Sequence, residues 1–265
     1  MRFMIFRKAD AATEAGVMPT TELFEAMTAY NESLTRAGVM LDGMGLKRSA
    51  EGVRYHYTDG EAAVVDGPFA EAKELVAGFT VIQARSLDEA VAWARRWPGA
   101  EDGDPTLEVR QVQEPVPAFG AADPARRQFV ALLTHDEAEA EAGPTPEEEA
   151  AMGQLLADAA EAGVLVEAGG LYPSSAGARV VFEGGVPTVV DGPFAEAKEV
   201  IGGYAIYQAD SLEDLRPWSE RFGRAIGTGT SEIRPVFGDA DFGEAFTPEL
   251  QAREDAMRAE SAARS

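Results

Sequence analysis

The sequence predicts an α+β protein made of two ferredoxin-like repeats that pack sheet against sheet as a pseudo-dimer. The nonapeptide DGPFAEAKE occurs twice, at residues 66–74 and 191–199, which are 125 residues apart in a chain of 265. A period this long indicates two copies of one domain, because a solenoid unit spans only about 20 to 50 residues. Flanking segments repeat at the same spacing: Ala-Gly-Val at 37–39 and 162–164, and Val-Val at 64–65 and 189–190.

Each copy begins with the pattern of a strand, a loop and a helix. Short apolar runs at residues 2–7 and 129–133 predict the first strands. The first helix is expected at 21–36, where Leu23, Met27, Tyr30 and Leu34 recur at steps of three and four residues. The second copy has its counterpart at 146–161. A glycine follows each helix, at 38 and 163, as a helix C-terminus favours.

The remaining elements of each copy follow in one order. A second strand (39–46, 164–171) leads into a hairpin that turns at 58–61 or 183–185, and a third strand (79–83, 204–208) follows. Ser86 with Glu89 predicts a capping box at the start of the next helix, and Ser211 with Asp214 predicts a weaker one. A last strand is expected at 107–112 and 231–236.

This order is β-α-β, an inserted hairpin, then β-α-β, with helices on one face of an antiparallel sheet. The other face is left bare, so two copies have a physical reason to pack together. We divide the chain into a first domain (1–113), a proline-containing linker (114–125), a second domain (126–240) and a C-terminal tail (241–265). The tail is expected to form a charged helix that is either docked by Leu250 and Met257 or frayed.

Composition limits the classes of function. The chain has no cysteine, which excludes disulfides, thiolate metal sites and a cysteine nucleophile. Its net charge of −23 disfavours direct binding to nucleic acid. There is no apolar segment of the length of a membrane span and no secretory signal pattern, so we expect a cytoplasmic protein that does not bind membranes. His56 and His135 have no partner histidine at ligand spacing, so no metal site and no cofactor are expected.

The nonapeptide has the composition of a defined turn. Asp66 is suited to accept backbone N–H groups two or three residues ahead, Gly67 tolerates positive φ, and Pro68 fixes φ at the start of a helical turn. Phe69 is expected to enter the core, and residues 70–74 favour a helical turn. The second copy repeats these structural roles in Gly192, Pro193 and Phe194.

A functional interpretation of the same segment is also open. Asp66 and Asp191 would then be acid–base residues or ligand anchors, with a pKa tuned by burial or by a nearby arginine. Arg54 and Arg179 occupy matching hairpin positions and are the candidate partners. Other candidates for ligand binding are Tyr55, Tyr204, Ser49 and Ser174. The repetition of the aspartate does not decide between the two interpretations, because a demanding turn would also be kept.

The repeated DGPFAEAKE, the Ala-Gly-Val…Gly-Leu segment before it and the Glu-x-Arg near each end resemble the YCII-related family, in particular its DGPF subgroup. The resemblance covers nearly the whole chain as two tandem copies. It implies a ferredoxin-like fold that assembles as a dimeric α/β barrel, and it includes relatives with a proposed Asp–His catalytic pair, among them a dehydrochlorinase-like enzyme. Many members carry histidine after the Gly-Leu pair, whereas this chain has Lys47 and Tyr172.

Three functions are therefore considered. The first is binding of an unknown small molecule in a regulatory or accessory role; family members are often encoded beside extracytoplasmic-function sigma factors. The second is a lyase- or hydrolase-like enzyme that uses Asp66 and Asp191. The third is a protein-interaction module whose partner is a sigma factor, favoured by the net charge of −16 over residues 121–265. Further homodimerisation through the outer faces is left open.

Overall fold

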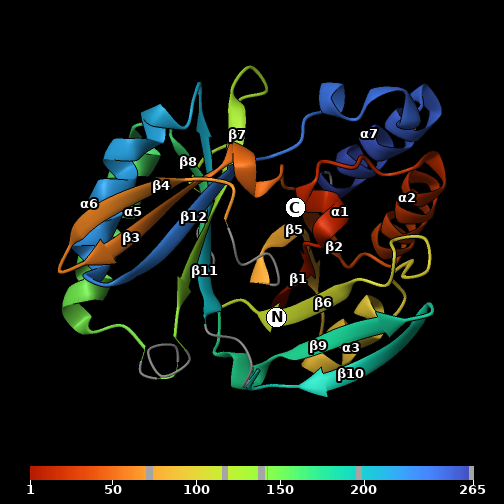
Figure 1. Ribbon diagram of the computed structural model, residues 1–265, viewed down its shortest axis with the longest axis horizontal. Helices are drawn as coiled ribbons and strands as arrows, with labels where there is room; N and C mark the ends of the chain where they lie inside the picture. Colours follow the sequence, from red (N-terminus) through yellow and green to blue (C-terminus); the bar gives the residue numbers. More distant parts are fainter. Residues whose placement is uncertain (70–73, 115–118, 137–140, 142, 195–198, 263–265) are drawn as a thin grey trace.

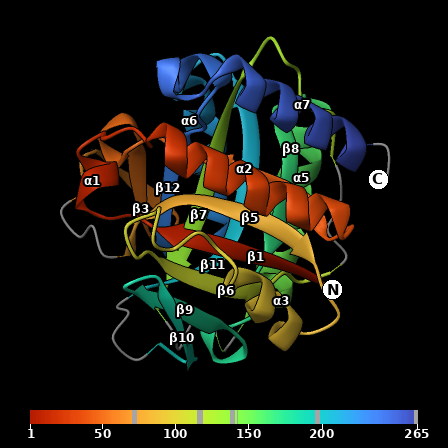
Figure 2. The ribbon, with the colours of Figure 1, turned by 90° about the vertical axis from the view of Figure 1, so that its right-hand side faces the viewer.

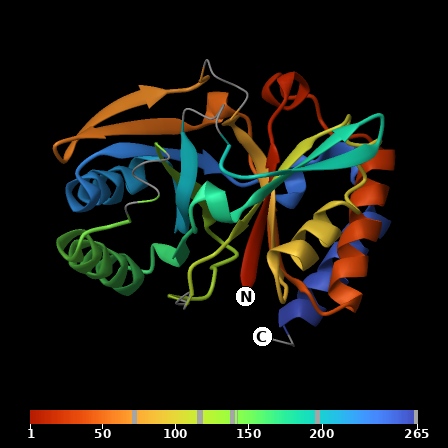
Figure 3. The same ribbon diagram turned by 90° about the horizontal axis from the view of Figure 1, so that it is seen from below.

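The chain forms a sandwich of two six-stranded antiparallel sheets with helices on both outer flanks (Figure 1). The computed structural model describes residues 1–69, 74–114, 119–136, 141, 143–194 and 199–262. Seen from below, the two sheets face each other in the middle and the helices lie to either side (Figure 3). The predicted α+β fold class, with two repeats packed sheet to sheet, is confirmed.

The first copy supplies a four-stranded core in ferredoxin-like order. β1 (Arg2–Lys8) lies between β6 (Thr106–Gln111) and β5 (Val76–Gln83), and β2 (Met40–Gly45) pairs with β5. Two helices cover the outer face, α2 (Thr21–Arg36) and α3 (Leu87–Ala94), and a short helix, α1 (Ala11–Glu14), precedes them. The bounds of α2 are those expected from the sequence. Thr20 caps α2, where its side chain accepts from the N–H of Leu23.

The second copy repeats this core. β7 (Arg127–His135) lies between β12 (Gly229–Pro235) and β11 (Val200–Ala209), and β8 (Leu165–Gly170) pairs with β11. α5 (Pro146–Glu161) and α6 (Arg216–Ile226) cover the outside, and α5 also has its expected bounds. α6 begins later than the Ser211 cap indicates, because a 3-10 turn (Glu213–Leu215) comes first.

Each hairpin joins the sheet of the other copy. β3 (Val53–Thr58) and β4 (Glu61–Asp66) come from the first copy, but β3 pairs with β12 of the second. In return, β9 (Ala178–Glu183) pairs with β6, and β10 (Val186–Asp191) forms the edge. Figure 1 shows each hairpin beside the helices of the opposite copy. Sequence alone placed each hairpin only along the chain, and the pairing partner is a finding of the structure.

The hydrophobic core has three main parts. One lies between the two sheets, where side chains such as Phe6, Phe79, Leu132 and Ile206 are buried. The other two lie under the helices of each copy, and each includes side chains of an exchanged hairpin. The first-copy core contains Val180 and Phe182; the second-copy core contains Val53, Tyr55 and Tyr57. The two copies therefore fold as one unit, because neither helix-covered core is complete without the other copy.

The tail forms α7 (Pro248–Ala262), which lies along α2 (Figure 2). Leu250 is 3% exposed and Met257 is 9% exposed, so the docked alternative is the one observed. Arg253 also pairs with Glu32 of α2 at 2.6 Å. None of the helices within the described residues is long and apolar enough to cross a membrane.

Two cap predictions need correction. Ser86 caps α3 as predicted, because its hydroxyl accepts from the N–H of Glu89 at 3.2 Å; the return bond of the box is absent, since the Glu89 carboxylate accepts from the N–H of Arg85 at 2.8 Å, one residue before Ser86. The pair expected to be weaker is the reciprocal one, because Ser211 N–H donates to Asp214 and Asp214 N–H donates to Ser211. Arg85 also pairs through its side chain with Glu89, which explains the shift.

Candidate functional site

The Asp-Gly step of the nonapeptide ends each hairpin against a backbone carbonyl. A Cβ at Gly67 would lie 1.8 Å from the carbonyl oxygen of Ser49, and one at Gly192 would lie 1.8 Å from that of Ser174. Glycine is required there by close approach rather than by positive φ. Asp66 is exposed at the end of β4 opposite Val53, and Asp191 is exposed at the matching position of β10.

The phenylalanine of the motif is held by two side chains, those of Ser49 and Arg54. Phe69 is buried, and its N–H donates to Ser49 Oγ at 3.2 Å rather than to Asp66 as expected. The Arg54 guanidinium lies over the ring, 4.3 Å from its centroid, a cation–π contact. The predicted ligand-binding residues Arg54 and Ser49 thus meet at Phe69. The helical turn expected after it falls mostly on residues 70–73, which lie outside the described residues.

The second copy repeats this arrangement. The N–H of Phe194 donates to Ser174 Oγ at 3.3 Å, and the Arg179 guanidinium lies 4.3 Å from the ring centroid. Each arginine also forms an ion pair across the copies: Arg54 with Glu232 at 2.7 Å, and Arg179 with Glu108 at 2.9 Å. The hairpin exchange therefore brings each motif to the last strand of the other copy.

Glu108 and Glu232 are central residues that sequence reasoning did not select. Glu108 is 1% exposed and binds Lys8, Arg110 and Arg179 at 3.0, 3.0 and 2.9 Å. Burial alone would raise its pKa, but the attraction of these three cations outweighs burial and lowers the pKa to about 2. Glu108 is therefore a fixed anion. The Glu-x-Arg pattern that repeats near the end of each copy was the sequence signal that could have identified these two glutamates.

A buried arginine accompanies each glutamate. Arg234 contacts Glu232 at 2.8 Å and donates to the backbone carbonyls of Lys47 and Val76. Burial lowers its pKa, and Glu232 and Glu14 oppose that effect. Gly52 makes room for its stem, because a Cβ there would lie 2.5 Å from Arg234 Cγ. Glu14 of α1 binds both the N–H and the hydroxyl of Ser49, which joins this network to the motif.

A small cavity of about 40 Å³ lies between the two sheets among these charged groups. The lining combines apolar and polar side chains, and both copies supply them. The apolar ones are Leu75, Val76, Leu132 and Ile201, and the polar or charged ones are Lys8, Arg54, Glu74, Thr134, Glu199 and Glu232. Of the residues proposed from the sequence, only Arg54 lines this cavity.

The tyrosine candidates lie elsewhere. Tyr55 is buried under α6 and stacked on Tyr57, and burial raises its pKa. Tyr204 lies between the sheets and donates to Glu167 at 2.5 Å; burial and that carboxylate raise its pKa. Where many relatives have histidine, Lys47 pairs with Asp241 at 2.5 Å and Tyr172 is 41% exposed. Within the described part of the chain, no group of three or more acidic or histidine side chains is arranged to hold a metal.

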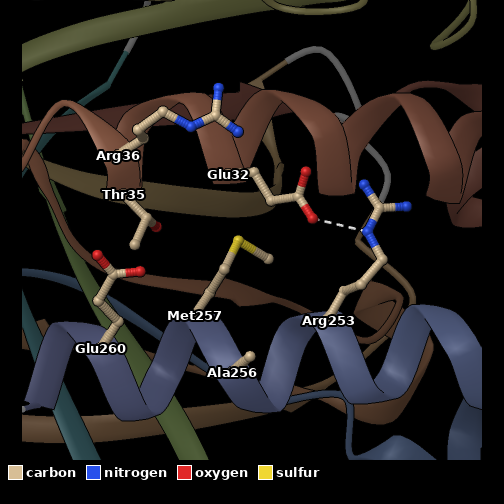
Figure 4. Close-up of a pocket in the computed structure, with 7 residues that line it drawn as sticks. All are labelled: Glu32, Thr35, Arg36, Arg253, Ala256, Met257 and Glu260. Atoms are coloured by element: carbon tan, nitrogen blue, oxygen red, sulfur yellow. Dashed lines mark hydrogen bonds and ion pairs between the residues drawn. The ribbon is translucent and has the colours of Figure 1, made fainter.

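A larger groove of about 260 Å³ lies between α2 and α7 (Figure 4). Met257 points into it, and Glu32 and Arg253 pair with each other at its edge. The groove depends on the tail helix, which follows only the second copy. It is therefore not part of the repeated domain, and the smaller cavity is the better candidate site because it is built from the repeated motifs.

The chain is similar to a curated protein and to several solved structures. An uncharacterised protein of Rhizobium meliloti (strain 1021) is 34% identical over 84 residues, which cover 32% of this chain and 68% of that protein. Among solved structures, a putative monooxygenase from Lactobacillus acidophilus NCFM has a TM-score of 0.42 at 11% identity, covering 89% of this chain and 92% of that one. A mutant chlorite dismutase from Candidatus Nitrospira defluvii has a TM-score of 0.46 at 10% identity, with 92% and 93% covered.

The YCII-related domain matches the chain twice, over residues 1–114 and 128–239. These matches contain both nonapeptides, both exchanged hairpins and both Glu-x-Arg strands. The chain therefore belongs to the YCII-related family, as two tandem copies of its domain.

Proposed function

We propose that this protein binds a small polar molecule in the cavity between its two sheets, in a regulatory or accessory role. The observation that carries the proposal is the lining of the cavity, which combines charged side chains of both copies with four apolar side chains. Ligand sites commonly combine an apolar surface with a few placed polar groups. Glu199 is exposed, so the cavity has access to solvent.

Preorganisation supports the proposal. Arg54 is held by Glu232 and Phe69, and Lys8 is held by Glu74 and Glu108 at 3.2 and 3.0 Å. Charged groups fixed before binding lose little conformational freedom when a ligand arrives. A stable fold does not need such a cluster, because apolar packing can replace buried ion pairs at little or no cost.

A ligand screen by two-dimensional NMR tests this function. We expect at least one small polar metabolite to shift the backbone amide signals of Thr134, Glu199 and Glu232 in a saturable way. Signals of α2 and α7 are the control, because the groove there is a separate site. The proposal would be refuted if the compounds that bind shift only the signals of α2 and α7, or if no compound shifts the signals of the cavity residues.

The enzyme alternative stays a prediction with its own test. Asp66 and Asp191 are exposed at the hairpin ends and do not line the cavity, so their replacement separates the two ideas. If the double variant D66N/D191N keeps its melting temperature and its cavity ligands, the aspartates are free to serve another role. Sigma-factor association also stays a proposal from the family resemblance, to be tested by pull-down.

A further inference from the structure

The two halves of the cavity differ at one pair of equivalent positions. Lys8 in β1 pairs with Val76, and Thr134 in β7 pairs with Ile201. A register irregularity precedes the pairing in both copies, at Arg7/Lys8 and at Ile201/Gly203. Thr134 therefore occupies in the second copy the place that Lys8 occupies in the first.

In the first copy, this position supplies an ammonium group to two carboxylates. Lys8 Nζ lies 3.2 Å from Glu74 and 3.0 Å from Glu108, and the side chain is 7% exposed. Glu74 is the last residue of the first nonapeptide, and Glu108 belongs to the first Glu-x-Arg strand. The chain thus contains an example of how this site binds a protonated amine.

In the second copy, the carboxylates remain but the ammonium group does not. Glu199 and Glu232 are the equivalents of Glu74 and Glu108, and both line the cavity beside Thr134. The Thr134 hydroxyl donates to the Glu199 carboxylate at 3.0 Å. The lone pairs of the same oxygen can still accept a hydrogen bond from a ligand. Among the described side chains, this half therefore has one cation fewer beside the cavity than the first half.

We propose that the second-copy half of the cavity binds a protonated primary amine in the place of the Lys8 ammonium group, between Glu199, Glu232 and Thr134. The inference rests on the proposed function and gives the chemical class of its ligand. The volume of about 40 Å³ is close to that of a single water molecule in the liquid, about 30 Å³, so an ammonium head group fits. Leu132 and Ile201 offer an apolar surface to a short alkyl chain, and the exposed Glu199 marks the exit.

A divalent metal ion suits this place less well than an amine. Arg54 and Arg234 already contact Glu232 at 2.7 and 2.8 Å, so a doubly charged ion would lie close to two guanidinium groups. A metal also requires several oxygen ligands at short distance. An ammonium group needs only three acceptors, and two carboxylates with one hydroxyl provide them.

Methylammonium chloride is the probe for the test, compared with tetramethylammonium chloride at equal ionic strength. The second cation has no N–H to donate and exceeds the cavity. We expect methylammonium to raise the melting temperature of the wild type saturably, by about 2 to 3 °C at tenfold excess over its dissociation constant. It should also shift the amide signals of Thr134 and Glu199.

The matched variants fill the proposed amine site with a longer side chain at position 134. T134K rebuilds the side chain of the first copy, and T134M has a similar length without the charge; both should abolish the response. T134S keeps the hydroxyl and the space, and should respond like the wild type. Because each variant is judged by its own response to methylammonium, a change in basal stability does not obscure the result.

Each remaining outcome decides the matter. A T134K variant that responds like the wild type, or a wild type that responds equally to both salts, overturns the inference. Potassium chloride that reproduces the full effect overturns the assignment to an amine. Neutral or anionic metabolites that shift the cavity signals while methylammonium does not would refute the amine and leave the proposed function standing.

Discussion

Replacing Glu108 by glutamine removes the fixed anion that neutralises two buried cations, Lys8 and Arg110, and the half-buried Arg179. In this variant Lys8 and Arg179 still form ion pairs with Glu74, and Arg110 still donates to the backbone carbonyl of Tyr172. The substitution is close to isosteric, so packing is retained and the electrostatic contribution is what changes. Removing one partner of a buried ion pair typically destabilises by about 3–5 kcal/mol.

The pKa of Glu108 gives an independent magnitude. It falls from 4.5 to about 2 on folding, which corresponds to about 3 kcal/mol of stability at neutral pH. Because the folded pKa is the lower one, this contribution is fully present above the unfolded value and is lost as pH falls towards the folded value. Between pH 7 and pH 3 the wild type should therefore lose about 2 kcal/mol from this group alone.

Urea unfolding at a series of pH values measures both effects. We expect the free energy of unfolding of E108Q to lie about 3 kcal/mol below the wild type at pH 7, and this difference to shrink by about 2 kcal/mol at pH 3. E61Q, at an exposed residue of β4, is the control and should change little. A difference between E108Q and the wild type that is independent of pH would refute the reasoning.

Further predictions concern the motif, the tail and the exchange. G67A should destabilise by about 1–3 kcal/mol or more by forcing a Cβ against Ser49, whereas G153A, in open space on α5, should be neutral or slightly stabilising in thermal melts. F69A should lower the free energy of unfolding by about 3–5 kcal/mol, measured in urea, with F69L losing less. Truncation after residue 246 removes the buried Leu250 and Met257 and should destabilise by about 3 kcal/mol in the same assay. Co-expressed fragments 1–113 and 126–265 should form a one-to-one complex by size-exclusion chromatography with light scattering, and two stable monomers would contradict the exchange.

The sequence predicts the local elements well because each depends on nearby residues. The bounds of α2 and α5 follow from a stripe of apolar residues, a threonine cap and a glycine after the last turn. Gly38 and Gly163 indeed have positive φ, 73° and 66°. The sheet order of each core also follows, since antiparallel strands with two crossover helices have few other solutions.

The partner of each hairpin could not be read in the same way. β3 alternates buried and exposed residues, and such a pattern fits any free strand edge of the right polarity. The two copies offer almost the same edge, in β6 and β12. Which edge is used depends on contacts between segments that are far apart in the sequence, and those exist only in the folded chain.

The same exchange explains why the candidate site escaped sequence reasoning. The repeated motif directed attention to Asp66, yet the buried acids that meet Arg179 and Arg54 are Glu108 and Glu232, 71 and 178 residues away along the chain. Each of these acids forms its ion pair with the hairpin arginine of the other copy. A fused pair of domains has a consequence that two identical chains do not: one half can change while the other is kept. Lys8 and Thr134 are such a difference: the first copy places an ammonium group at this position beside the cavity and the second copy places a hydroxyl group there, which is the asymmetry on which the proposed amine site depends.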